Sequence, residues 1–190
     1  MFQQRPYLIP NTMKWGKILI LVCLLAFSGC RSTHAPDQKK LEKLEDLYKV
    51  IYDLYQKLGY KEIDSINKVY DTLDQQITFF ADSIGNGLSV SDYRKLEKIH
   101  SNLYNYLHVS NSFNEEIFTL EDNISRLEYY IRSGKMSDSL FYVRFDKESQ
   151  ELYDLADRIN DKRKIVLNSI SSYYRIKPQV DKVINTGLFK

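Results

Sequence analysis

Apolar residues recur at alternating intervals of three and four over most of the chain after residue 37, a pattern that predicts long helices packed on one another. The longest unbroken register runs from residue 96 to residue 131, with Ser110 as its one polar member. One helix of about 40 residues, about 60 Å long at 1.5 Å per residue, fits this stretch best. A break at Ser110-Asn111-Ser112 is the alternative, because Ser112 and Glu115 have capping-box spacing. The apolar members are Leu96, Ile99, Leu103, Tyr106, Phe113, Ile117, Leu120, Ile124, Leu127 and Ile131.

Two shorter apolar registers precede this one, on either side of Gly59-Tyr60, and they are displaced from each other by one residue. They indicate either one bent helix of about 45 residues or two separate helices. We favour the bent helix, since a glycine costs about 1 kcal/mol inside a helix but need not end it. The first register is Leu41, Leu44, Tyr48, Ile51, Tyr55 and Leu58, widened by Leu47 and Leu54, and the second is Ile63, Ile66, Tyr70, Leu73, Ile77 and Phe80.

The last register is less regular and is expected to end or kink at Pro178, with one further turn over Val180–Ile184 before a loose tail. Polar residues stand at three of its positions, namely Glu148, Lys162 and Ser169. The apolar positions are Phe141, Phe145, Leu152, Leu155, Ile159, Val166 and Tyr173.

Short turns separate these helical stretches. Gly85-Asn86-Gly87 is the strongest turn signal, because glycine and asparagine tolerate the positive φ of a tight reversal. Ser133-Gly134-Lys135 is expected to close the central helix. Ser89 or Ser91 can cap the helix after the first turn, and Ser137 or Ser139 the helix after the second.

The pattern therefore predicts an all-α fold, an elongated antiparallel three-helix bundle with coiled-coil-like heptad seams. In plan it resembles spectrin-like three-helix bundles, a likeness of architecture that implies no activity. Breaks at both Gly59 and Ser110 would give a shorter bundle of five or six helices. The seams could also serve dimerisation, but short turns favour closure within one chain.

The first 30 residues have a different character. Lys14 and Lys17 precede an apolar run from Ile18 to Phe27, as in a secretory signal, and the run is too short to span a bilayer. Met13 is an alternative start of the chain. We expect residues 1–29 to be a removed signal, 30–37 a tether, 38–186 the bundle and 187–190 a tail.

The signal ends in Phe27-Ser28-Gly29-Cys30, which resembles the lipobox of bacterial lipoproteins. In that family small residues precede a cysteine that is lipidated and becomes the new N-terminus. The resemblance implies acyl chains such as palmitate on Cys30 and an outer-membrane anchor, with the body on the periplasmic face. A plain secretory signal with an incidental cysteine is the alternative. Cys30 is also the one cysteine that remains after cleavage, which favours lipidation over a free thiol.

Removal of residues 1–29 takes away three of the 27 Lys and Arg residues and none of the 25 Asp and Glu residues, which leaves 24 against 25. A near-neutral body with both signs interspersed has no electrostatic footprint for nucleic acid. The chain contains no phosphate loop or nucleophile elbow, and Glu97 with His100 is a single ligand-like pair that nothing completes. We expect no enzyme activity, no cofactor and no metal.

Four aromatic residues off the apolar register are separated by 11, 14 and 11 residues. At about 100° per residue they lie within about 40° of one another on a continuous helix. We call Tyr93, Tyr104, Phe118 and Tyr129 the aromatic strip and interpret it as a candidate partner-binding surface. The alternatives are that the C-terminal segment covers these rings, or that they are scattered surface residues.

These features favour a membrane-anchored helical scaffold or adaptor that binds another protein of the bacterial envelope. The chain is similar to small helical lipoproteins that accompany trans-envelope machines, such as accessory lipoproteins of type VI secretion in Bacteroidota. An immunity or inhibitor lipoprotein against a toxin or hydrolase is the alternative. A ligand-binding bundle would need a cavity that the large apolar residues disfavour.

Overall fold

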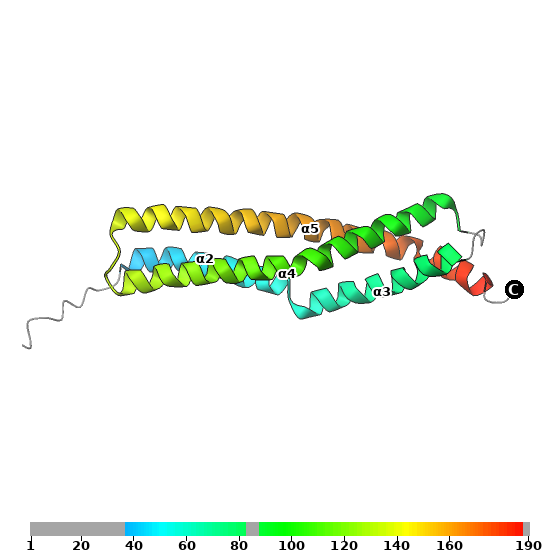
Figure 1. Ribbon diagram of the computed structural model, residues 1–190, viewed down its shortest axis with the longest axis horizontal. Helices are drawn as coiled ribbons and strands as arrows, with labels where there is room; N and C mark the ends of the chain where they lie inside the picture. The colour runs from blue at the N-terminus through cyan, green and yellow to red at the C-terminus, as the bar shows by residue number, and fades with distance from the viewer. Residues whose placement is uncertain (1–36, 83–87, 188–190) are drawn as a thin grey trace, which may run out of the picture. The chain divides into compact units, whose positions relative to one another are not determined.

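In the computed structural model, which describes residues 37–82 and 88–187, every regular element is a helix (Figure 1). The signal, Cys30, the tether up to residue 36, the Gly85-Asn86-Gly87 turn and the last three residues lie outside the described residues. The helices are α2 (Gln38–Lys57), α3 (Tyr60–Asp82), α4 (Val90–Arg132) and α5 (Asp138–Gly187). The all-α prediction is confirmed.

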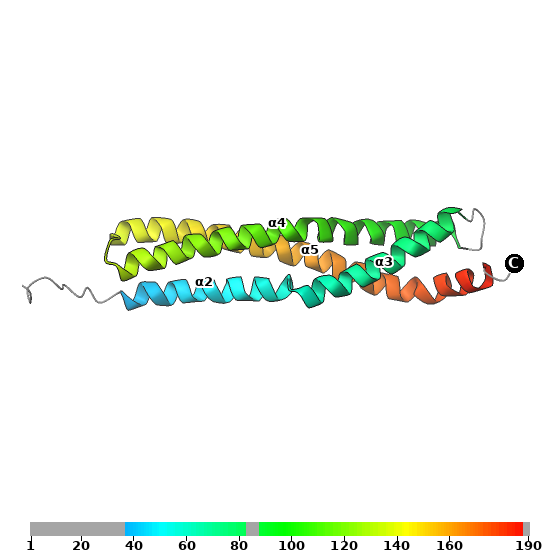
Figure 2. The same cartoon turned by 60° about the horizontal axis from the view of Figure 1, so that its bottom comes forward.

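The helices form an antiparallel bundle with three legs, in which α2 and α3 together make the first leg, α4 the second and α5 the third (Figure 2). Lys40 near the start of α2 bonds Asp138 at the start of α5 at 2.5 Å, so the first and third legs run in the same direction. Tyr48 and Tyr55 donate to Glu128 and Glu121 of α4, and this reversed order shows that α4 runs the opposite way. The predicted bundle topology is therefore confirmed.

The first leg is two helices, so the favoured single bent helix is wrong and its alternative holds. The amide of Gly59 donates to the Gln56 carbonyl at 3.3 Å, a tightened turn that ends α2. The Gly59 carbonyl then accepts from Glu62 and Ile63, which begins α3. A Cβ added at Gly59 would lie 3.2 Å from the Gln56 carbonyl oxygen, so a larger residue would crowd this turn. The break absorbs the one-residue shift between the two apolar registers.

Helix α4 is continuous through Ser110, as predicted, and all eleven positions of its register are buried. We call these positions the α4 seam. Ser110 does not break the helix, because its hydroxyl donates to the Leu107 carbonyl at 2.8 Å and is thereby satisfied in the core.

The buried positions of the first leg differ in part from the predicted ones. Six predicted register positions lie half-buried at the edges of the bundle, so their assignment to the buried register is wrong, namely Leu41, Tyr48, Tyr55, Ile63, Tyr70 and Ile77. The phenol groups explain the edge positions of Tyr48 and Tyr55, since each hydroxyl reaches a carboxylate at the rim. The buried residues are Lys40, Leu44, Leu47, Ile51, Leu54 and Leu58 in α2 and its cap, and Ile66, Val69, Leu73, Gln76 and Phe80 in α3.

Three buried polar residues of the bundle are paired across helices. Gln76 accepts from the Tyr173 hydroxyl at 3.1 Å, and Glu148 and Ser169 accept from Asn123 and Asn102 at 3.0 and 2.9 Å. Such pairing removes most of the cost of burying a polar group. Two of the three polar interruptions in the α5 register are thus core positions with partners, whereas Lys162 is exposed.

Pro178 lies inside α5, which continues to Gly187, so of the two alternatives, an end or a kink, the end is wrong. Proline cannot donate to the carbonyl of Tyr174, four residues earlier. The Tyr174 side chain is exposed, so that carbonyl lies on the side of α5 that water can reach. Val180, directly beyond the proline, is fully buried and keeps the end of α5 packed on the bundle.

The helix ends follow the predicted caps. The Ser89 hydroxyl accepts from the Asp92 amide at 3.1 Å, and that of Ser137 accepts from the Leu140 amide at 3.4 Å. At the end of α4, Gly134 adopts a φ of 65°, and the amide of Lys135 donates to the Tyr130 carbonyl. This is a Schellman motif, which lets the chain turn directly into α5.

Candidate functional site

The structure leaves three of the four residues of the aromatic strip on the surface of α4. Tyr104, Phe118 and Tyr129 are 53%, 68% and 58% exposed, so neither α5 nor its C-terminal end covers them. Tyr93 is half-buried and packs against the core. Large apolar side chains at this level of exposure are the kind of residue that protein interfaces bury.

Tyr104 belongs to a group of stacked rings between α3 and α4. Its ring lies 6.3 Å from that of Tyr70 and stacks on His108 at 6.0 Å with an interplanar angle of 3°. His100 stacks on Tyr70 at 4.6 Å, and its Nε2 lies 3.0 Å from Asp74 Oδ1. These contacts hold Tyr104 in a defined orientation while one side of its ring faces outward.

The other two strip residues stand apart from Tyr104. Phe118 lies 14 residues further along α4, and Tyr129 lies 11 residues beyond Phe118, or about 21 and 16 Å at 1.5 Å per residue. Tyr129 has Tyr130 at 5.6 Å and the Lys135 ammonium at 5.8 Å from its ring. The strip is therefore three separate anchors along one helix and not a continuous apolar patch.

A second line of exposed apolar residues lies on α5 and was missed in the sequence. Tyr142, Tyr153, Leu167 and Tyr174 are all more than two-fifths exposed. They follow one another at 11, 14 and 7 residues, which at 100° per residue keeps them within about 60°. The angular test that found the strip on α4 would have found this line as well.

A partly buried ion pair links α3 and α5. Arg163 donates to both carboxylate oxygens of Glu62, at 2.6 and 3.0 Å, and these bonds raise the pKa of Arg163 above its ordinary value. Tyr106 lies in this electrostatic environment at 1% exposure, and burial raises its pKa to about 12. Within the described residues its hydroxyl has no hydrogen-bond partner. An unpaired buried hydroxyl costs about 1 to 3 kcal/mol.

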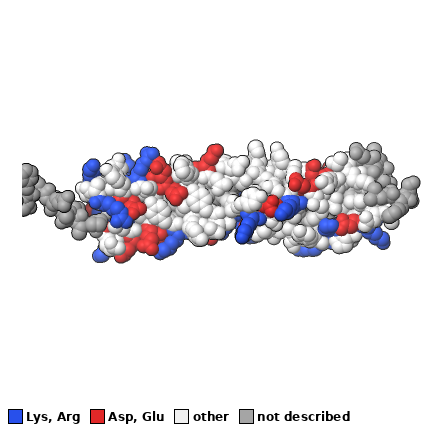
Figure 3. Space-filling model, turned by 90° about the horizontal axis from the view of Figure 1, so that it is seen from below, with Lys and Arg blue, Asp and Glu red and all other residues white. Residues whose placement is uncertain are grey.

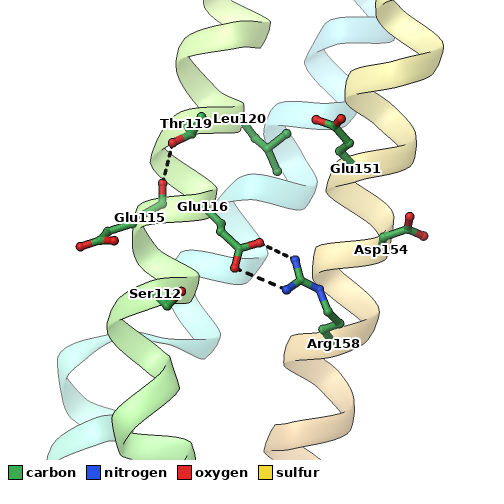
Figure 4. A pocket seen from close by; sticks show the side chains of 8 residues that line it. All are labelled: Ser112, Glu115, Glu116, Thr119, Leu120, Glu151, Asp154 and Arg158. Atoms are coloured by element: carbon green, nitrogen blue, oxygen red, sulfur yellow. Dashed lines mark hydrogen bonds and ion pairs between the residues drawn. The ribbon is translucent and has the colours of Figure 1, made fainter.

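A groove of about 740 Å³ runs between α4 and α5 (Figure 4). Glu115 and Glu116 of α4 and Glu151 and Asp154 of α5 line it, and Arg158 pairs with Glu116 across it. Four carboxylates against one guanidinium make this part of the surface acidic. The face in Figure 3, by contrast, shows Lys and Arg side chains interspersed with Asp and Glu.

The described residues contain no group of three or more His, Cys, Asp or Glu side chains that could hold a metal ion. His100 turns to Asp74 of α3 instead of forming a site with Glu97. None of the helices in the described part is long and apolar enough to cross a membrane.

Comparison with known proteins returned no match, either to a family model, to a curated protein or to a solved structure.

Replacing Tyr106 by Phe tests the unpaired hydroxyl. We expect the free energy of unfolding near neutral pH to be unchanged or to rise by about 1 kcal/mol, because the variant buries no unsatisfied group. The folded-state pKa of Tyr106 is about 12, above the unfolded value of about 10, so the wild type loses stability as pH rises through this interval. The Tyr106→Phe variant should lose less stability than the wild type over the same pH interval. Urea denaturation near neutral pH and near about pH 11 measures both effects.

Tyr52→Phe is the matched control, since Tyr52 is 67% exposed and should show neither effect. A large destabilisation of Tyr106→Phe near neutral pH would show that the hydroxyl has a partner in solution.

Proposed function

We propose that this chain is a lipid-anchored helical adaptor of the bacterial envelope that binds another envelope protein through the aromatic strip. The observation that carries the proposal is the exposure of Tyr104, Phe118 and Tyr129 on one helix whose opposite side is wholly buried. Aromatic residues lose little conformational entropy on binding and contribute much of the energy at interface hot spots.

The geometry of the strip favours an elongated partner. Three anchors spaced over about 38 Å of α4 match the length of a helix or of an extended segment that lies along it, and exceed the reach of a small molecule. The α4 seam holds the anchors in a fixed order on a rigid rod, so a partner would be ordered along the bundle instead of moving with a loop.

Anchoring depends on Cys30. We expect Cys30→Ala to move the protein from the membrane fraction to the soluble fraction, because stable attachment needs two or more acyl chains and each buried CH2 contributes about 0.8 kcal/mol. Fractionation of cells with immunoblotting measures this directly. Equal membrane attachment of the variant would contradict a lipid anchor on Cys30.

The binding surface is tested by a Tyr104→Ser, Phe118→Ser, Tyr129→Ser triple variant. We expect in-cell crosslinking and co-purification from wild-type cells to recover a stoichiometric envelope protein, and the variant to lose it. Each ring is exposed, so its replacement should leave the circular dichroism spectrum and thermal unfolding close to wild type.

The line on α5 offers a control of matched chemistry. Tyr142→Ser, Tyr153→Ser, Tyr174→Ser removes three rings of similar exposure from another helix and should leave the partner bound. Equal loss of the partner in both triple variants would assign binding to general surface hydrophobicity. Recovery of no partner from wild-type cells would contradict the adaptor function.

A further inference from the structure

The face formed by α4 and α5 has hollows of opposite charge at its two ends. The end shown in Figure 4 contains Glu115, Glu116, Glu151 and Asp154, with Arg158 as its one cation, and we call it the acidic end. Of its carboxylates, Glu116 is paired with Arg158, and Glu151 lies 3.6 Å from the Lys147 ammonium. Glu115 and Asp154 are exposed.

The hollow at the other end, of about 700 Å³, is basic. Lys95, Lys98 and Arg175 line it, and none of its lining residues is acidic. Lys95 bonds Asp92 at 2.8 Å, outside the lining, whereas Lys98 and Arg175 are exposed. Its remaining lining residues are neutral polar or apolar, namely Ile99, Asn102, Ile165, Asn168, Ser169, Ser172 and Ile176.

A smaller hollow of about 370 Å³ lies between the two ends. It shares Ser112, Glu116 and Arg158 with the acidic end, so the two are continuous. Its further lining includes Val109 and the opposite charges of Asp161 and Lys162. The α4–α5 face is therefore acidic at one end, balanced in the middle and basic at the other end.

We propose that this face binds a second copy of the chain in antiparallel orientation, with the acidic end of each copy on the basic end of the other. A two-fold axis across the face brings opposite charges together at both ends. A parallel pairing would place like charges against each other, so the charge pattern selects the antiparallel one.

The positions of the charges satisfy the symmetry. On each helix, the axis must pass through the midpoint between the charge at the acidic end and the charge at the basic end. A single axis therefore needs the midpoint on α4 and the midpoint on α5 to lie at the same height along the bundle. Lys98 and Glu115 have their midpoint between residues 106 and 107, and Arg175 and Asp154 have theirs between 164 and 165. Asn102 contacts Ser169, and Glu116 contacts Arg158, so these pairs show which residues of α4 and α5 lie at the same height. Interpolation between the two pairs places residues 106–107 opposite about residue 165. The two midpoints thus coincide to within about one residue.

The size of the face suits a modest dimer. From residue 95 to residue 120 α4 extends about 39 Å, and two helices are about 20 Å wide, so each copy offers about 800 Å². This equals the area that each partner buries in an interface of standard size. Few apolar groups are exposed on the face, Ile165 being 46% exposed, so association should depend mainly on charge and weaken in salt.

The proposal does not rest on the aromatic strip, because none of the strip residues lines the groove. A bound envelope partner on the strip and a second copy on the groove are separate contacts. Either can fail without the other.

Paired charge reversals test the arrangement. One variant is Lys98→Glu with Arg175→Glu, and the other is Glu115→Lys with Asp154→Lys; all four side chains are exposed, so the fold should tolerate them. Each variant alone places like charges at both contacts of the dimer. An equimolar mixture of the two variants places opposite charges at both contacts.

The measurement is sedimentation of the full chain in detergent at about 0.05 M and about 0.5 M salt. We expect the wild type to form a dimer whose dissociation constant rises at least about tenfold at the higher salt. Each variant alone should be monomeric, and the mixture should form a heterodimer. Lys39→Glu with Lys61→Glu changes the net charge as Lys98→Glu with Arg175→Glu does, but at exposed positions outside the groove. This control variant should leave the dimer intact.

Three results would overturn the proposal. A wild type that is monomeric at low salt would do so, as would a dimer that neither groove variant weakens, or a mixture that stays monomeric. Binding of poly-glutamate to a monomeric wild type, lost in Lys98→Glu with Arg175→Glu, would assign the basic end to an acidic partner instead of a second copy.

Discussion

The burial of the α4 seam is the constraint on which the rest of the bundle depends. Helix α4 contacts α2, α3 and α5, so the buried side of this single 43-residue helix contributes to the shared core of all three legs. Burying side chains such as Leu103, Ile117 and Ile124 completely is worth about 1.5 to 3 kcal/mol each before entropy is counted. The breaks and turns elsewhere, at Gly59 and at Gly134, serve to keep the other helices against this side.

Because the seam uses only one side of α4, the other sides remain available for binding. The flanks next to the seam carry paired polar groups, such as Asn102 with Ser169 and Glu116 with Arg158, which set the level of α5 against α4. These pairs line the charged groove, whereas the exposed rings of the aromatic strip lie elsewhere on α4. A helical bundle with two chemically different surfaces can bind more than one protein.

The central helix could be predicted closely from the sequence because its register is long and consistent, and a single polar residue with a local hydrogen bond does not interrupt it. The buried positions of the first leg were harder to predict, since α2 and α3 each offer alternative apolar stripes. Packing against α4 decides that Val69 is buried while Tyr70 lies at the edge of the bundle. The exposure of Tyr104, Phe118 and Tyr129 followed from helical geometry, but that of Tyr93 depended on tertiary packing. The oppositely charged groove was not predictable, because it requires the relative level of two helices that no local pattern contains.

Hydrogen exchange of the backbone amides, resolved by residue in the full chain, tests the central role of α4 most directly. We expect the slowest exchange to follow α4 from Leu96 to Ile131 without a gap, and Gly59 and the helix ends to exchange faster. Fast exchange between Leu107 and Phe113 would contradict it, because α4 would then be two helices, and neither the aromatic strip nor the two-fold arrangement of charges would have a rigid support.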